Sequence, residues 1–385
     1  MRLHEYEAAD LFAEAGIAVP ERLLARTPGE VRDATEDIGC PVIVKAQVLV
    51  GGRGKAGGIR SADNPSDAER VAAELLAADI RGVPVESVLV SRRIDIAGEY
   101  YVGITVDGYS GRPVVMVSAE GGVSIEDVAA ASPEKIATVA IEDGERFLPY
   151  RARHLISSIP VDTAHVGRLA DIVVKLYDVF RRYDALIAEI NPVAVCADGT
   201  LMAVDAVLEV DDSSLYRHRG ELPSPGGRIT SERERQGRDI GVTYVELDGD
   251  IGLIASGAGL GMATMDIIGK RLSPANFLET GGGITETLLY DCMRLVLSKP
   301  GLRGVLINVY GGINPIHEGA KGVIRYMKEH GVTIPIVAKA LGNRQEETWE
   351  ILRSGSVHVV TDVATEKAVD LMEHLIGPVA EGGAE

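Results

Sequence analysis

The chain has 385 residues, of which 46% are hydrophobic and 25% charged, as in an ordinary soluble globular protein of two or three domains. Its 57 acidic and 39 basic residues give a net charge of −18, which argues against general binding to nucleic acid or to an acidic membrane surface. Three widely spaced cysteines match no CxxC pattern and predict reduced thiols in the cytoplasm, and no apolar run approaches the roughly 20 residues of a membrane span.

The first half of the chain mixes predicted helices and strands. Residues 1–16 predict an amphipathic helix that lacks the apolar core of a signal peptide. Further helices are expected at residues 30–39, 65–79 and 162–183, strands at 85–91, 99–107 and 113–119, and a β-hairpin from 185–195 and 201–209. This pattern favours an α+β half with antiparallel pairing.

Residues 45–58, KAQVLVGGRGKAGG, follow the first predicted core strand. Glycines let backbone N–H groups approach an anion closely, because no Cβ stands in the way. Lys45, Arg53 and Lys55 add positive charge in a chain that is otherwise acidic. The combination predicts a phosphate-binding loop, and the alternative is a flexible surface loop.

The hairpin near residue 198 carries a candidate metal site. Strand periodicity places Glu189 and Asn191 on one face. A three-residue loop at 197–199 would put Asn191 directly opposite Asp205, and a two-residue loop would make them diagonal neighbours. An amide and a carboxylate oxygen, completed by substrate phosphates, suit Mg²⁺, and the alternative is an ordinary polar cross-strand pair.

The composition changes at residues 211–240, which are rich in Arg, Ser, Pro, Gly and Asp. We interpret them as a linker or an extended surface segment, and place the domains at 1–235 and 236–385. In the second domain, strands are expected at 251–255, 275–278, 305–309, 334–338 and 357–359. Glycine-rich turns and helices between them predict βαβ units, a parallel sheet and a ligand-binding edge, although such glycines can also serve tight turns alone.

Together these motifs resemble the β subunit of the succinate–CoA ligase (succinyl-CoA synthetase) family over nearly the whole chain. The stretches that carry the resemblance are LHEYEAADLFAEAGI, KAQVLVGGRGKAGG, AEGGVSIEDVA, AEINPVAV, ELDGDIG, SGAGLGMATMDII, PANFLETGGG and NVYGGI. The resemblance implies an ATP-grasp half of two subdomains, followed by a flavodoxin-like ligase domain.

The resemblance also implies an activity shared with a partner. ATP or GTP, with Mg²⁺, would phosphorylate a histidine of an α subunit that also binds CoA, and the phosphate would then activate a dicarboxylic acid. Glu189 would lie beside that histidine, and Asn191 and Asp205 would bind Mg²⁺. The residues implied to contact nucleotide are Lys45, Gly52, Arg53, Gly54, Ser91, Ile94 and Glu99, and those implied to contact the acid are Ser256, Gly312, Ile313 and Asn314.

The chain departs from the family pattern near both substrates. Ser91 replaces a Glu on the adenine side, which leaves ATP or GTP open, and Ser256 replaces an Asn that touches the organic acid. The turn 311–319 lacks the usual Arg-Cys-Asp run, Lys339-Ala340 replaces Arg-Leu, and Ala206-Val207 replaces Gly-Lys. The acid therefore need not be succinate, and malate or a longer diacid are the alternatives. The sequence also leaves open whether the assembly contains one αβ pair or two.

Other functions compete with this interpretation. A silent nucleotide-binding subunit is disfavoured because Lys45, Arg53, Glu189, Asn191 and Asp205 are all retained. A dinucleotide oxidoreductase is disfavoured because SGAGLG misses the last spacing of the GxGxxG fingerprint. His317 raises the idea of a second phosphohistidine within this chain, against an ordinary loop histidine that contacts solvent or the partner.

Overall fold

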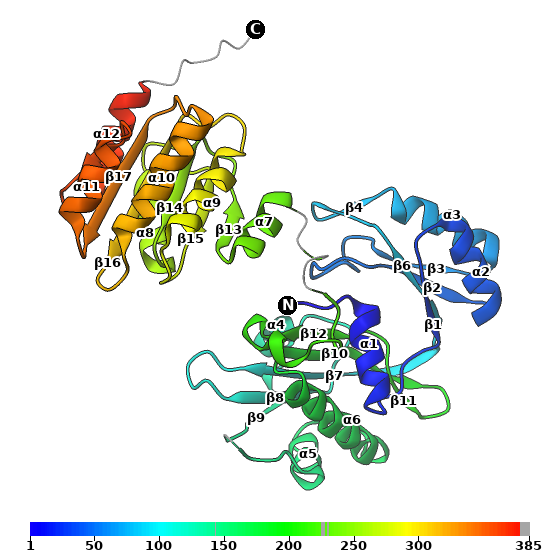
Figure 1. Ribbon diagram of the computed structural model, residues 1–385. Coiled ribbons are helices and arrows are strands. Elements are labelled where there is room, and N and C mark those ends of the chain that lie inside the picture. Colours follow the sequence, from blue (N-terminus) through cyan, green and yellow to red (C-terminus); the bar gives the residue numbers. More distant parts are fainter. Residues whose placement is uncertain (143, 225–227, 229–230, 378–385) are drawn as a thin grey trace. The chain divides into compact units, whose positions relative to one another are not determined.

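The computed structural model describes residues 1–142, 144–224, 228 and 231–377 (Figure 1). The chain divides into two compact units, Met1–Pro223 and Ser224–Glu385. Among the described residues, no helix has both the length and the apolar character needed to cross a bilayer.

The described part of the N-terminal unit contains two large antiparallel sheets and one two-stranded hairpin. The smaller sheet has the strand order β1-β6-β2-β3. Helices α2 and α3 pack against it through a core that includes Val31, Val44 and Leu75. Its elements are β1 (Arg22–Ala25), α2 (Pro28–Ile38), β2 (Val42–Ala46), β3 (Ile59–Ala62), α3 (Pro65–Leu76) and β6 (Val88–Arg92), with the short hairpin β4 (Asp79–Ile80) and β5 (Val83–Pro84) beside them.

The larger sheet of this unit has six strands. Its order is β11-β10-β7-β8-β9, and β12 also pairs with β10. The strands are β7 (Ile96–Val106), β8 (Pro113–Ser118), β9 (Ile136–Ala140), β10 (Ala185–Cys196), β11 (Leu201–Ala203) and β12 (Val207–Val210). The remaining helices are α1 (Glu5–Glu14), α4 (Ile125–Ala131), α5 (Pro149–Ile156) and α6 (Thr163–Arg182), with 3₁₀ helices at Pro133–Lys135 and Asp212–Arg217. The predicted antiparallel α+β half is confirmed.

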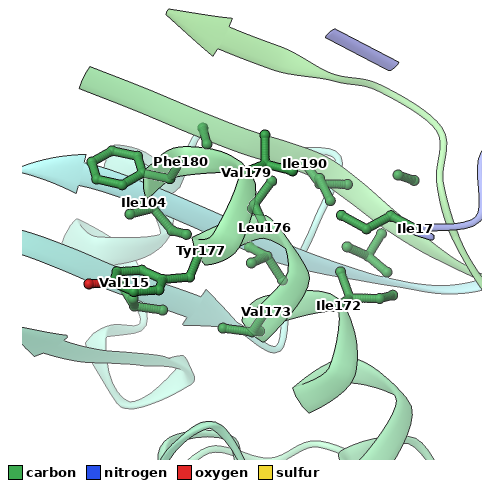
Figure 2. Packing of buried hydrophobic residues seen from close by; sticks show 14 of the residues in the cluster. Ile17, Ile104, Val115, Ile172, Val173, Leu176, Tyr177, Val179, Phe180 and Ile190 are labelled. Carbon is green, nitrogen blue, oxygen red and sulfur yellow. The ribbon is translucent and has the colours of Figure 1, made fainter. Parts of the chain in front are cut away.

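Helix α6 supplies much of the core beneath the larger sheet. Its apolar residues recur at helical spacing, so Ile172, Leu176 and Val179 share one face. Figure 2 shows this face against Ile104 of β7 and Ile190 of β10. This packing anchors β7 and β10, the two strands that carry Glu99 and Glu189.

The C-terminal unit is a six-stranded sheet of order β13-β15-β14-β16-β17-β18. The five strands from β15 to β18 run parallel in the flavodoxin-like order 2-1-3-4-5. The strands are β13 (Thr243–Glu246), β14 (Ile251–Ala255), β15 (Asn276–Glu279), β16 (Gly304–Gly311), β17 (Ile336–Gly342) and β18 (His358–Val360). Its helices are α7 (Glu232–Ile240), α8 (Ala258–Ile268), α9 (Glu286–Leu297), α10 (Ile316–His330), α11 (Gln345–Arg353) and α12 (Thr365–Ile376).

Two features of this unit differ from expectation. The segment 211–240 is predicted to be a linker or an extended surface segment, but it contains a 3₁₀ helix and α7. Helix α7 has few apolar residues and packs through Gly237 against Tyr244. Strand β13 adds an unexpected antiparallel edge, paired with β15. The predicted boundary after residue 235 falls inside α7, while the compact units divide at Pro223, and the functional domain limits stay a prediction.

Close packing of α10 on α9 predicts a large effect of Gly322→Ala. A Cβ at residue 322 would lie 2.0 Å from the backbone oxygen of Glu286. We expect the free energy of unfolding of the C-terminal unit to fall by about 3 kcal/mol, as overpacking does elsewhere. Urea unfolding followed by fluorescence of Trp349, the only tryptophan of the chain, measures this unit.

Gly259→Ala is the matched control for that substitution, because residue 259 also lies in a helix but a Cβ there meets nothing within 4 Å. The control should lose no stability. Equal midpoints for Gly322→Ala and the wild type would contradict the packing described here.

Candidate functional site

A cleft of about 900 Å³ lies within the N-terminal unit and is lined by residues from both of its sheets. Every site residue predicted in this half of the chain lines it, so residues from five separate stretches of sequence come together. They are Lys45, Gly52, Arg53, Gly54, Ser91, Ile94, Glu99, Glu189, Asn191 and Asp205.

The glycine-rich loop forms one wall of the cleft. Strand β2 brings in Lys45, and the chain turns back to β3 with the N–H of Gly58 donating to the oxygen of Arg53 at 2.8 Å. Gly52 has a φ of +70°, a conformation that residues with a Cβ rarely adopt. The guanidinium of Arg81, from the β4–β5 turn, lies 2.9 Å from where a Cβ of residue 52 would be. The backbone at Gly51, Gly52 and Gly54 is exposed, and the missing Cβ at residue 52 leaves room for the Arg81 guanidinium.

Four charged side chains form a network of ion pairs beside this loop. The ammonium of Lys45 donates to Glu5 at 2.8 Å and also to the backbone oxygen of Val204. Arg53 pairs with Glu5 and donates to Oδ1 of Asp205 at 2.7 Å. Lys45, Arg53 and Glu5 are each less than a tenth exposed. The cluster thus links α1, the glycine-rich loop and the β10 hairpin, and its formal charges cancel.

Burial and neighbouring charges move the pKa values of the two carboxylates of this cluster in opposite directions. Burial by itself would raise the pKa of Glu5, but the charges of Lys45 and Arg53 outweigh it and hold that pKa below its usual range. Burial raises the pKa of Asp205, and the Glu5 charge raises it further against the pull of Arg53. A cation that approached Asp205 would therefore stabilise a carboxylate whose charged form its surroundings disfavour.

The β10 hairpin has the register expected for a three-residue loop. Val193 faces Ala203 in β11, and Glu189 faces Val207 in β12. Asn191 and Asp205 occupy the intervening positions, where the two short strands are interrupted. The amide oxygen of Asn191 accepts from the N–H of Gly122 at 2.8 Å, and its nitrogen donates to the oxygen of Val123 at 3.0 Å.

Among the described residues, no three His, Cys, Asp or Glu side chains are grouped to hold a metal ion. The donor set that Asn191 and Asp205 offer is two oxygens, one of them an amide. Such a pair fits Mg²⁺ only when substrate phosphates and waters complete its coordination.

Two further carboxylates face the cleft from neighbouring strands. Burial raises the pKa of Glu189, and a hydrogen bond of 3.2 Å from the hydroxyl of Tyr101 opposes that rise. Burial also raises the pKa of Glu99. Ser91, in β6, and Ile94, which follows that strand, also line the cleft.

The predicted acid-binding residues lie in the C-terminal unit, at the carboxyl ends of β14 and β16. The order of the sheet reverses between these two strands, which is the position where open α/β sheets bind ligands. The hydroxyl of Ser256 accepts from the N–H of Tyr310 at 2.8 Å and so joins the two strand ends. Gly312, Ile313 and Asn314 follow β16, and Ile313 is 94% exposed.

His317 lies in the first turn of α10 and is 5% exposed, so it is not a loop histidine in contact with solvent. Its Nε2 lies 2.9 Å from the guanidinium of Arg344. A buried ring in contact with a cation is a poor position for a phosphate acceptor that must move between sites.

Sequence reasoning missed three side chains around the cleft: Glu5, Tyr101 and Arg81. Glu5 follows the predicted opening of a helix, where an acidic residue needs no further explanation. Tyr101 sits in a strand as any core tyrosine would. Nothing in the sequence predicts that Arg81 adopts a φ of 56° in its turn. No local signal marks them, because their partners lie far away along the chain.

Comparisons with known proteins agree with this architecture. Residues 2–195 match the ATP-grasp domain family and residues 254–372 match the CoA-ligase family. The chain is 42% identical to the β subunit of an ADP-forming succinate–CoA ligase from Roseiflexus sp., over 96% of this chain and 98% of that protein. It is 40% identical to the β subunit of a GDP-forming succinate–CoA ligase from Thermus thermophilus, over 97% and 99%.

Among solved structures, an ATP citrate lyase from Methanothrix soehngenii in complex with citrate and coenzyme A superimposes with a TM-score of 0.79. The two are 19% identical over 97% of this chain and 99% of that one, so this likeness concerns the fold alone. The chain, with its ATP-grasp domain and its CoA-ligase domain, belongs to the family of succinate–CoA ligase β subunits.

Proposed function

We propose that this chain is the β subunit of an NDP-forming succinate–CoA ligase and that its cleft binds ATP or GTP. The observation that carries the proposal is the cleft itself. Two buried cations, Lys45 and Arg53, stand beside an open glycine loop, and Asn191 and Asp205 offer oxygen ligands on the facing hairpin. Binding of a polyphosphate with a divalent cation requires both positive charge around the phosphates and oxygen ligands for the metal ion.

In this proposal Asn191 and Asp205 hold Mg²⁺ together with the nucleotide phosphates. The ion would neutralise phosphate charge and orient the triphosphate. The protein's own residues do the rest: Lys45, Arg53 and the glycine loop bind the phosphates, and Ser91, Ile94 and Glu99 bind the nucleoside. Catalysis of phosphoryl transfer depends mainly on such positioning and charge neutralisation.

The family name, a β subunit, implies a partner α subunit. In this proposal the partner carries the histidine that is phosphorylated and the CoA site. The bond between the β and γ phosphates breaks, a bond from phosphorus to a histidine nitrogen of the partner forms, and the nucleoside diphosphate leaves. The phosphoryl group then passes to a carboxylate oxygen of succinate. The CoA thiol attacks the acyl carbon, the acyl–oxygen bond breaks, and phosphate leaves with the thiol proton.

Glu189 is the proposed catalytic residue of this chain, beside the partner's histidine. Ser256, Gly312, Ile313 and Asn314 are proposed to contact the acid at the switch point of the sheet. We also propose a cytoplasmic enzyme of paired α and β subunits, a setting supported by the three cysteines, none of which is paired.

The test is reconstitution with a succinate–CoA ligase α subunit from the same genome. The purified pair should form the CoA thioester of an acid only with Mg²⁺ and a nucleoside triphosphate, and the partner should acquire acid-labile phosphate. A complex that bound nucleotide without either product would contradict the proposal and favour a silent subunit.

A panel of acids tests the substrate. We expect kcat/KM for succinate to exceed that for malate and longer diacids, because the identity of 40–42% to succinate–CoA ligase β subunits extends over 96–97% of the chain. If the site were instead built to hydrogen-bond a hydroxyl such as that of malate, kcat/KM for succinate would be lower by about 10⁴-fold, because polar groups of the site would stay unpaired. Preference for malate by that margin would identify Ser256 and the altered turn as a changed acid site.

A further inference from the structure

Tyr101 occupies an unusual position on the cleft side of β7. It is 2% exposed, and its hydroxyl donates to Oε2 of Glu189 at 3.2 Å. Burial, reinforced by the Glu189 charge, raises the pKa of Tyr101 well above its usual value. The phenol therefore remains a proton donor at neutral pH.

Gly103 makes this position possible. It is the register partner of Glu189 across the β7–β10 pair, two residues along the strand from Tyr101. A Cβ at residue 103 would lie 2.2 Å from the hydroxyl oxygen of Tyr101 and 2.7 Å from the ring carbon that bears it. The tyrosine ring thus lies over a residue without a side chain and reaches the carboxylate on the neighbouring strand.

A β-bulge lies opposite the same tyrosine. The register of β10 against β7 shifts between Ile190 and Val193, so that Asn191 and Pro192 together face one residue, Tyr101. Bulges re-aim side chains and occur often beside active sites. The tyrosine, the glycine and the bulge therefore form one local arrangement around Glu189, and the proposed mechanism uses only the carboxylate.

We infer that Tyr101 is a positioning residue, which fixes the Glu189 carboxylate in the orientation needed beside the partner's histidine. This inference rests on the proposed function. A Glu side chain without a partner samples several rotamers, whereas a hydrogen bond to one carboxylate oxygen leaves the other oxygen in a defined place. Small misplacement of a reacting group costs up to about 100-fold in rate.

Tyr101→Phe tests the role, because it removes the hydroxyl and keeps the ring. In the complex with the partner subunit, we expect the single-turnover rate of histidine phosphorylation from ATP and Mg²⁺ to fall about 10-fold, the size of one hydrogen bond to a charged group. The Kd for the nucleotide, measured by calorimetry, should stay within about twofold, because Tyr101 does not line the cleft.

Tyr100→Phe is the matched control. Tyr100 is also buried, and its hydroxyl bonds Nδ1 of His165 at 2.9 Å on the other face of the strand. This variant should phosphorylate the partner at the wild-type rate.

A second variant, Gly103→Ala, should slow phosphorylation at least as much as Tyr101→Phe, since its methyl group displaces the tyrosine hydroxyl.

A double-mutant cycle separates positioning from general structural damage. If Tyr101 acts through Glu189, then Glu189→Ala and the double variant Glu189→Ala/Tyr101→Phe should be equally slow, while independent effects would multiply. Multiplying effects, a wild-type rate for Tyr101→Phe, or a loss of nucleotide affinity equal to the loss of rate would overturn the inference. A wild-type complex that never phosphorylates its partner would instead contradict the proposed function, and this inference with it.

Discussion

Asp205→Asn should lower nucleotide-dependent phosphorylation of the partner by about 100-fold or more, the largest effect we expect from a single substitution. The change keeps the shape of the side chain but removes the charge that pairs with Arg53 and that is proposed to meet Mg²⁺. The Arg53 side chain is 11% exposed and the Asp205 side chain 29%, and removing the charge of one member of a hydrogen-bonded pair whose partner is buried costs about 2–5 kcal/mol. Phosphorylation rates at saturating ATP, measured across a range of Mg²⁺ concentrations, check this.

Asp198→Asn is the control for the same hairpin. Asp198 lies in the turn, where its carboxylate accepts hydrogen bonds from the N–H and the hydroxyl of Thr200. It should leave the rate unchanged within about twofold, as exposed substitutions usually do. Comparable losses in both variants would mean that Asp205 supports only the hairpin, and would remove the argument for its place in the nucleotide site.

Glu5→Gln should lower the melting temperature of the N-terminal unit by about 6 to 12 °C. The substitution leaves Lys45 and Arg53 buried with Asp205 as the remaining carboxylate of the cluster. Breaking a buried pair in this way costs about 3 kcal/mol or more, and each kcal/mol shifts the midpoint of a unit of this size by about 2–4 °C. Differential scanning calorimetry measures the shift.

Glu14→Gln changes the same kind of residue at the exposed end of the same helix. Its melting temperature should match the wild type within about 2 °C, since it breaks no buried pair. If the two variants have the same melting temperature, then the charge cluster of Glu5, Lys45, Arg53 and Asp205 does not stabilise the nucleotide-free protein. A stable Glu5→Gln protein would also show that Lys45 and Arg53 keep their places without this carboxylate.

Elements whose signal is local could be predicted from the sequence. The strands after residue 250 were expected within a few residues of their observed bounds, because short apolar runs ending in glycine turns alternate with amphipathic helices. For the hairpin the sequence leaves a two-residue and a three-residue loop open, and the observed register is that of the three-residue loop, in which Asn191 and Asp205 are at opposite positions. Helix α7 was missed because it has little apolar surface and depends on contacts with β13.

The parts of the site that sequence could not reveal depend on distant contacts. Glu5 meets Lys45 across 40 positions and Tyr101 meets Glu189 across 88. In the sequence, Gly103 looks like any other glycine in a strand. The structure shows why a glycine is needed there, because the Tyr101 ring occupies the space that a Cβ would take. In each case the residue type is ordinary and only the tertiary fold gives it a partner.

One measurement tests the central claim most directly, namely that the cleft of the N-terminal unit holds a nucleoside triphosphate with a divalent cation between the glycine loop and the β10 hairpin. The folded complex with its partner subunit is titrated calorimetrically with ATP and with GTP, in Mg²⁺ and again in excess chelator. We expect saturable binding of at least one of the two nucleotides at one site per chain, weakened strongly by the chelator. Absence of any Mg²⁺-dependent uptake of either nucleotide would contradict the account.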